Sequence, residues 1–403
     1  MNAVLKNIAF AVITAGLALA LLEAGLRLLG PPPSVAPEEM PAELPGHFKI
    51  DPVMGWRPNP GQPFIDPGYA NWMAQFGVDI SELDAEPTNS QGYRDSELAK
   101  PRPVDQVRVY AMGDSSVMGA GAPRQMTYAQ RLERALASPW SDDPASRSVE
   151  VINAGVAGYS SLQSLALLEG DLAVGLDAVI CYSMNSDLMT THGATDSELF
   201  GGVLSSPGAR GGAAALAPLK NAYLSRWLAW GLQKRPSRSR GPRSRVSLSD
   251  YGANLRRLID MGQRNGFEVI FVLPPTPGDL IYPQPRETYI VDSETAERRI
   301  AAMLVGEARR ASGVYTRETL RAVMALEAWR GGAPIIDGPT TVLEAYLGDR
   351  EAFAGQRGLF VDEIHPSVEG HRVLAEAILP VLKPIVEDKR LQRLAAALGA
   401  PQR

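Results

Sequence analysis

The sequence has one cysteine and four histidines among its 403 residues. The single cysteine, Cys181, cannot form an internal disulfide, and its position inside an apolar run predicts a buried thiol rather than a reactive one. No cysteine-histidine cluster has the spacing of a zinc site. We therefore expect no dedicated metal site and no cofactor.

Excess positive charge is also lacking, because the formal net charge is -5 at pH 7. This balance excludes a basic nucleic-acid-binding domain. A phosphate-binding P-loop is excluded as well, since no lysine occurs between Lys100 and Lys220. A basic tract, Lys234 to Arg245, has six Lys or Arg in twelve residues. A flexible solvated loop is the favoured interpretation of this tract, and contact with anionic lipid headgroups or an anionic polymer is the alternative.

The first thirty residues predict a membrane segment rather than part of the fold. Residues Asn7 to Leu22 are uncharged and would span about 24 Å as a helix, short of the roughly 30 Å hydrocarbon core. Counting on to Leu29 reaches a full span, which favours an uncleaved signal anchor over residues 1–30. The anchor would make a single-pass inner-membrane protein whose large domain faces the periplasm or cell exterior. A cleaved signal peptide is the alternative, because Ala18-Leu19-Ala20 resembles a cleavage site.

Proline density predicts a spacer after the anchor. Residues 31–88 form a proline-rich linker, and Pro31 to Pro60 is typical of a semi-rigid extended segment or of disorder. Both interpretations exclude a packed element between these prolines. Aromatic residues in the linker, such as Trp56, predict that part of it packs on the domain surface. The main domain is expected over residues 89–390, followed by a tail over 391–403.

Short apolar runs alternate with helical patterns over the rest of the chain. The apolar runs predict five strands, at residues 107–112, 149–156, 178–183, 267–273 and 333–336. Helices are expected at residues 127–137, 161–174 and 251–265, from Thr316, and over 367–387, where Pro380 and Pro384 should kink or break the helix. Continuously apolar strands alternating with helices indicate a parallel sheet covered on both faces. We therefore expect an α/β fold, a three-layer α/β/α sandwich with a flavodoxin-like parallel sheet of about five strands.

Two insertions interrupt this alternation. They cover residues 188–249, with a helix-like run at 219–232, and residues 278–332. Insertions after strand ends often form the walls of a site.

Three residues follow the first three predicted strands directly, namely Ser115, Gly158 and Asn185. Ligands in parallel sheets bind at the carboxyl ends of the strands, so we expect these residues near one site. Ser115 follows a strand that ends on Gly113-Asp114, a turn typical of a nucleophile. The backbone N–H groups of Ser115 and Gly158 and the Asn185 amide are candidate donors to an oxyanion.

His365 is the histidine with the best-placed acidic partner. Asp362 precedes it by three residues, and Pro366 fixes the loop before the closing helix. Such a turn can bring Asp362 onto one imidazole nitrogen and leave the other free, as a catalytic base requires. A loop in which the two residues merely cap the helix is the alternative. Of the other histidines, His47 lies in the linker and His371 looks structural or exposed.

Four motifs in this order resemble those of the SGNH, or GDSL-type, hydrolase superfamily: GDSxxxG from Gly113, NAGxxG from Asn153, an asparagine block at Asn185 and DxxHPxxxGH from Asp362. The resemblance runs from about Asn89 to the end of the closing helix. It departs in the third block, where Ser183 and Ser186 replace the family's usual glycine and aspartate. The apolar N-terminal segment and proline-rich linker are similar to those of bacterial membrane-anchored members.

The resemblance implies a role for each of these residues. Ser115 would be the nucleophile, His365 the base and Asp362 its orienting acid. Ser115, Gly158 and Asn185 would form the oxyanion hole. The implied activity is hydrolysis of acetyl or short acyl esters on envelope glycans or lipids through an acyl-enzyme.

Two other functions remain open from the sequence. One is O-acetyl transfer to an envelope polysaccharide by the same triad, and the other is a non-catalytic envelope assembly protein on a retained fold. The expected partners are the ester substrate and the membrane, without nucleic acid. No oligomeric state is predicted.

Overall fold

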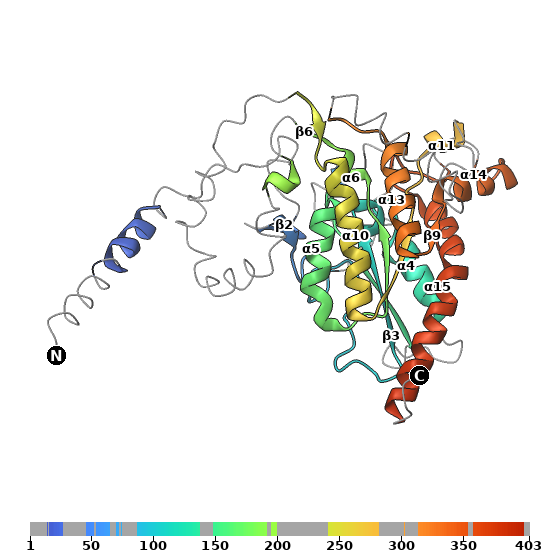
Figure 1. Cartoon of the computed structure of the whole chain (residues 1–403), viewed down its shortest axis with the longest axis horizontal. Coiled ribbons are helices and arrows are strands. Elements are labelled where there is room, and N and C mark those ends of the chain that lie inside the picture. Colours follow the sequence, from blue (N-terminus) through green and yellow to red (C-terminus); the bar gives the residue numbers. More distant parts are fainter. Residues whose placement is uncertain are drawn as a thin grey trace.

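A computed structural model of the chain describes residues 14, 16–26, 46–51, 54–64, 70–71, 74, 87–137, 148–191, 195–199, 241–281, 302, 313–353 and 358–398. Within this part, the chain folds around one parallel β-sheet with helices on both faces (Figure 1). Two small antiparallel pairs accompany it, formed by β1 (Phe48–Asp51) with β2 (Gly55–Pro58) and by β6 (Thr190–Thr191) with β7 (Arg243–Ser244).

The central sheet has five strands in the order β4-β3-β5-β8-β9. Their bounds are β3 Val107–Gly113, β4 Val149–Gly155, β5 Ala178–Tyr182, β8 Glu268–Val272 and β9 Ile335–Ile336. All neighbouring strands run parallel. The predicted α/β fold with five parallel strands is therefore confirmed, and the strand order is that of a flavodoxin-like sheet.

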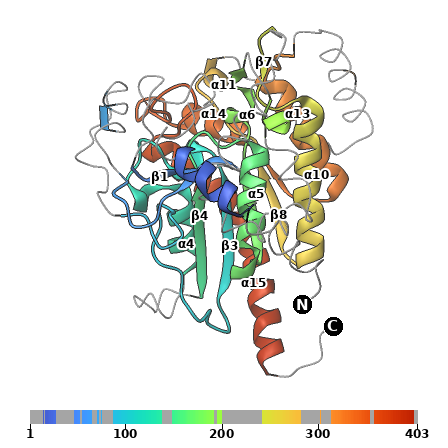
Figure 2. The same ribbon diagram turned by 90° about the vertical axis from the view of Figure 1, so that its left-hand side faces the viewer.

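Helices cover both faces of the sheet (Figure 2). One face carries α5 (Ser161–Asp171), α10 (Leu248–Asn265) and α13 (Arg317–Gly331), and the other carries α4 (Tyr128–Leu136) and α15 (Val368–Ala397). Alternate side chains of a strand point to opposite faces, so each strand contributes to two cores. In β3, Tyr110 and Met112 pack in the first core, and Val109 and Ala111 pack in the second.

Four further helices, three of them with four residues each, follow strands at the carboxyl edge of the sheet. They are α3 (Ser115–Met118), α6 (Asn185–Leu188), α11 (Gly278–Ile281) and α14 (Gly338–Gly348). The sequence did not predict α14. Because each of these helices begins just after a strand, this edge of the sheet is built from turns that present polar side chains.

The ends of the longer helices lie at residues whose side chains or conformations favour capping. The Thr316 side chain accepts a hydrogen bond from the Thr319 N–H at 3.2 Å, so α13 begins where expected. Ser160 and Gln163 form a capping box at the start of α5. Gly266 ends α10 with a φ of 75°, the left-handed conformation that glycine adopts without strain.

The closing helix α15 corrects two predictions. It is not broken at Pro380 or Pro384, and it continues to Ala397 through most of the predicted tail 391–403. Both prolines are exposed, so water can bind the carbonyl groups that their missing N–H groups leave unpaired. The opposite side of the helix is buried in the core, and this packing stabilises the helix across the two prolines.

The hairpin β1–β2 corrects the prediction that Pro31 to Pro60 contains no packed element. Trp56 of β2 is buried, and Gln163 of α5 donates to Met54 O at 2.6 Å in the turn of the hairpin. His47 is buried as well, with its ring centroid 5.0 Å from that of Phe64. The surface packing that was expected from the aromatic residues is therefore present within the predicted linker.

Several predicted segments lie partly or wholly outside the described residues. Of the anchor at 1–30, residues 14 and 16–26 are described and helical. No helix in the described ranges is both long and apolar enough to cross a bilayer. The predicted helical run 219–232 is not among the described residues.

Candidate active site

The turn between β3 and α3 presents Ser115 at the carboxyl edge of the sheet. Gly113 has a φ of 156° and lies so close to β5 that a Cβ there would be 2.0 Å from Tyr182 O. Asp114 caps α3, because its side chain accepts a 2.9 Å hydrogen bond from the Ser116 N–H. Ser115 is partly exposed between buried neighbours. The glycine and aspartate of the motif therefore build the turn that presents the serine.

Ser115, His365 and Asp362 form a continuous hydrogen-bonded relay. Ser115 Oγ lies 2.7 Å from His365 Nε2, and His365 Nδ1 lies 2.5 Å from Asp362 Oδ2. His365 is buried, and 10% of the Asp362 side chain is exposed. This geometry allows the imidazole to accept the hydroxyl proton while the carboxylate orients the ring.

The loop before α15 holds Asp362 in place. Asp362 Oδ1 accepts hydrogen bonds from the backbone N–H groups of Ile364 and His365, both at 2.8 Å. Burial alone would raise the pKa of Asp362, but the bond to His365, the imidazole charge and the backbone donors together lower it. The carboxylate therefore stays ionised beside the imidazole. The alternative that Asp362 and His365 merely cap the helix does not fit, because Ser367 is the N-cap of α15.

Ser116 connects three segments of the site. Its Oγ donates to Ile364 O at 3.2 Å and accepts from Asn185 Nδ2 at 3.3 Å. The neighbouring Ser186 donates from its backbone N–H to Asp114 Oδ2 at 3.3 Å. Asn185 therefore lies beside the nucleophile turn, and its amide has a second N–H. Sequence reasoning missed this bridging role of Ser116, since both partners are distant in the chain.

Gly158 lies in the loop that connects β4 to α5. Its φ is 75°, and the start of the loop is tied to β3 by a 3.1 Å hydrogen bond from the Val156 N–H to Gly113 O. β4, β3 and β5 are neighbours in the sheet. The structure therefore brings the segments of all three predicted oxyanion donors to one edge.

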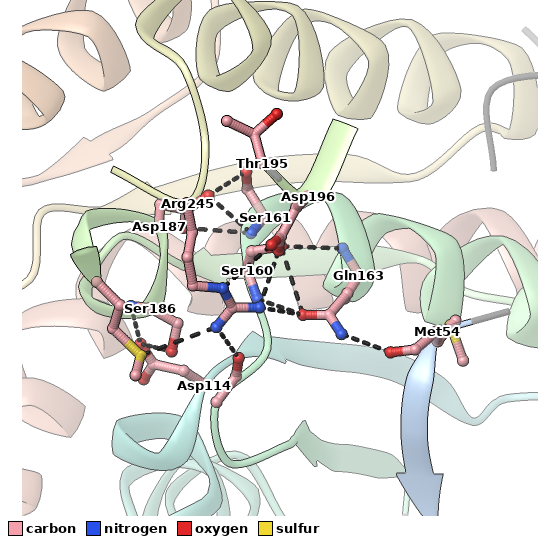
Figure 3. Close-up of polar contacts among 12 residues, drawn as sticks. Met54, Asp114, Ser160, Ser161, Gln163, Ser186, Asp187, Thr195, Asp196 and Arg245 are labelled. Atoms are coloured by element: carbon pink, nitrogen blue, oxygen red, sulfur yellow. Dashed lines mark hydrogen bonds and ion pairs between the residues drawn. The ribbon is translucent and has the colours of Figure 1, made fainter. Parts of the chain in front are cut away.

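Arg245 is buried at this edge, although a solvated loop was the favoured interpretation of the tract Lys234 to Arg245. Its guanidinium pairs with buried Asp196 at 2.8 Å (Figure 3). It also donates to Gly158 O at 2.8 Å and to Gln163 Oε1 at 2.9 Å. The solvated-loop interpretation is therefore wrong for this end of the tract, where the buried charge is paired. Residues 234–240 of the tract lie outside the described residues.

Asp187 is another buried carboxyl group near the site (Figure 3). It accepts hydrogen bonds from the Ser161 backbone N–H at 2.9 Å and from the Ser161 hydroxyl at 2.5 Å. Burial raises the pKa of Asp187 from 3.8 to about 7, against the opposing effect of these bonds. Because the folded-state pKa exceeds the unfolded value, folding takes up a proton between these pH values. The free energy of unfolding should therefore fall as the pH rises from about 4 to 7.

Replacing Asp187 with asparagine is expected to flatten this pH dependence. The amide can accept from Ser161 without ionising. As the pH rises from 5 to 8, the free energy of unfolding of the variant should therefore increase by about 2 kcal/mol relative to that of wild type. Urea unfolding at the two pH values measures the difference. Asp95→Asn should show a similar gain at a separate position, because burial, with the Glu133 charge as the next cause, raises the pKa of Asp95 to about 7. An unchanged pH slope in Asp187→Asn would contradict the prediction.

His371 and Cys181 are both buried. His371 Nδ1 accepts a 3.3 Å hydrogen bond from the Tyr128 N–H, and burial lowers the pKa of His371 to about 3, so the ring is neutral. Cys181 is buried as predicted, and burial raises its pKa. In the part of the chain that the structure describes, no group of three or more His, Cys, Asp or Glu residues could hold a metal ion.

Comparisons with known proteins find similarity to solved structures. No family model matches the chain, and no curated protein matches its sequence significantly. An α/β hydrolase, LAE5, from the metagenome of Lake Arreo has a TM-score of 0.38 at 15% identity, over 68% of this chain and 94% of that one. The acetylxylan esterase Axe2 of Geobacillus stearothermophilus has a TM-score of 0.37 at 16% identity, over 68% and 93%. The acetyl xylan esterase AlAXEase has a TM-score of 0.39 at 16% identity, over 68% and 99%.

Proposed function

We propose that this chain is a serine esterase of the SGNH type that hydrolyses acetyl or short acyl esters through an acyl-enzyme on Ser115. The observation that carries the proposal is the relay of Ser115, His365 and Asp362, with its two contacts of 2.7 and 2.5 Å. A serine hydroxyl is a poor nucleophile until an adjacent base takes its proton. The relay supplies that base and the carboxylate that orients it.

In the proposed reaction, His365 acts first as a base and then as an acid. His365 Nε2 accepts the Ser115 proton as Oγ attacks the ester carbonyl. The tetrahedral oxyanion accepts hydrogen bonds from the Ser115 and Gly158 N–H groups and from the Asn185 amide. His365 then protonates the leaving alcohol, and water that His365 activates releases the acid from the acyl-enzyme.

We also propose that residues 1–30 anchor the protein in the inner membrane, with the esterase domain outside the cytoplasm. Large apolar side chains are exposed in the described helical residues of this segment, which supports insertion into a lipid phase. Leu17 is 61% exposed and Leu21 is 74% exposed. From this position, acyl esters of envelope glycans or lipids are the substrates within reach. Membrane fractionation, with residues 1–30 deleted as the comparison, tests the anchor.

Product analysis with an acetylated glycan tests the proposed activity and its alternatives. The purified protein is incubated with acetylated xylo-oligosaccharide or acetylated envelope polysaccharide, with and without an unacetylated acceptor. Release of free acetate in both reactions supports hydrolysis. Acetyl groups on the acceptor would instead identify an O-acetyltransferase that uses the same acyl-enzyme. Neither product, combined with no labelling of Ser115 by a fluorophosphonate, would leave the non-catalytic assembly function.

A further inference from the structure

The loop that carries Gly158 is contacted by two side chains from distant parts of the chain. Trp56 of β2 is 5% exposed, and its indole N–H donates to Ala157 O at 3.0 Å. Arg245, which follows β7 directly, donates to Gly158 O at 2.8 Å. These two carbonyl groups belong to the peptide groups before and after the Gly158 Cα. Both peptide groups that flank this Cα are therefore held by buried side chains.

The two side chains are themselves fixed. The Arg245 guanidinium carbon lies 5.9 Å from the centre of the Trp56 ring, and buried Asp196 pairs with the guanidinium. The Tyr159 hydroxyl donates to Trp56 O at 2.6 Å, so the loop also binds the hairpin. A Cβ on Gly158 would lie 3.0 Å from Trp56 Cζ2, which means that the indole packs directly on the glycine. The contacts form one closed cluster rather than isolated bonds.

We propose that Trp56 and Arg245 form a clamp that holds the Gly158 N–H in the direction required to bind an oxyanion, which makes both of them positioning residues. This inference rests on the proposed acyl-enzyme chemistry. A peptide group is planar, so fixing Ala157 O also fixes the direction of the Gly158 N–H in the same plane. A hydrogen bond to that carbonyl polarises the amide and strengthens its N–H as a donor. A donor oriented in advance needs no reorganisation when negative charge develops.

Trp56→Phe tests the clamp, because phenylalanine keeps an aromatic ring but lacks the indole N–H. Thr88→Val is the matched control. Thr88 is buried, and its hydroxyl donates to Asn59 O at 2.7 Å and accepts from the Gln62 N–H at 3.2 Å, away from the Gly158 loop. Trp56→Phe loses one side-chain bond to a backbone carbonyl, and Thr88→Val loses one such bond and the bond from the Gln62 N–H, so the control should lose at least as much stability. The measurement is kcat and KM for p-nitrophenyl acetate, per active site titrated with a fluorophosphonate, together with the melting temperature.

We expect kcat per active site to fall roughly 10- to 100-fold in Trp56→Phe with little change in KM, because the oxyanion contact forms only in the transition state. Thr88→Val should keep the wild-type kcat. Equal losses in the two variants would show a merely structural role and overturn the inference, as would an unchanged kcat in Trp56→Phe. If the wild-type protein neither hydrolyses the ester nor reacts with the probe, the proposed function itself fails, and the inference fails with it.

Arg245→Lys provides the second test of the clamp. Lysine keeps a positive charge beside Asp196 but cannot bind Asp196, Gly158 O and Gln163 at once, because it lacks the planar fork of the guanidinium. The expected result is again a lower kcat per active site with little change in KM. A variant that loses only melting temperature would overturn the role assigned to Arg245.

Discussion

Replacing Ser115 with alanine is expected to lower ester hydrolysis about 10⁴- to 10⁶-fold while the protein stays folded. The serine supplies the attacking oxygen, so without it His365 has no hydroxyl to activate and no acyl-enzyme can form. The hydrogen bond of the Ser115 hydroxyl is to His365 Nε2. The turn itself is stabilised by contacts of Gly113, Asp114 and Ser116. The substitution should therefore remove the chemistry without removing the turn.

Covalent labelling with a fluorophosphonate measures this prediction directly. Wild type should be labelled on Ser115, and Ser115→Ala should not be labelled. Ser116→Ala is the control for the adjacent hydroxyl, because Ser116 Oγ is bonded to Ile364 O and Asn185 rather than to His365. Ser116→Ala should still be labelled, at a lower rate. Labelling that persists in Ser115→Ala would show that Ser115 is not the nucleophile.

Asp362→Asn is expected to lower kcat by about 10⁴-fold with little loss of stability. The asparagine Oδ1 can still accept from the Ile364 and His365 N–H groups, which keeps the loop in place. Its NH₂ group would face His365 Nδ1 in place of the carboxylate oxygen. That group donates, so Nδ1 must become the acceptor, and the proton moves to Nε2. The imidazole then faces Ser115 with an N–H and cannot take its proton.

Steady-state kinetics and thermal unfolding of the same preparation test the Asp362 prediction. Glu363→Gln is the matched control, because Glu363 is the exposed neighbour of Asp362 and undergoes the same change from carboxylate to amide. It should keep wild-type kcat. An Asp362→Asn protein with more than about a tenth of the wild-type kcat would contradict the role of Asp362 as the group that sets the imidazole tautomer.

Local chemistry made much of the fold predictable from the sequence. The five strands are short runs of apolar residues, and a strand buried on both faces requires such a run. Thr316 and Gly266 mark helix ends because their capping bonds join residues only three or four apart. The contact between Asp362 and His365 is likewise local, because the partners are three positions apart in the chain. Each of these features depends on near neighbours, which a sequence pattern records.

The features that sequence reasoning missed depend on distant partners. The proline content of residues 31–60 predicted a spacer, but burial of Trp56 against the Gly158 loop stabilises a hairpin there. The composition of Lys234 to Arg245 predicted a solvated loop, but Arg245 pairs with Asp196 and donates to Gly158 O in the interior. The composition of a segment predicts only the average exposure of its residues, and one buried partner is enough to place a charged residue in the interior.

The sequence by itself determined the α/β class, the five strands and the local Asp362–His365 pair of this protein. Only the tertiary structure decided the order of the strands, and with it the contact between Ser115 and His365, which are 250 residues apart. It also decided which buried side chains hold the Gly158 loop. The physical reason is that strand pairing and core packing bring together segments whose separation along the chain carries no information about their distance in space.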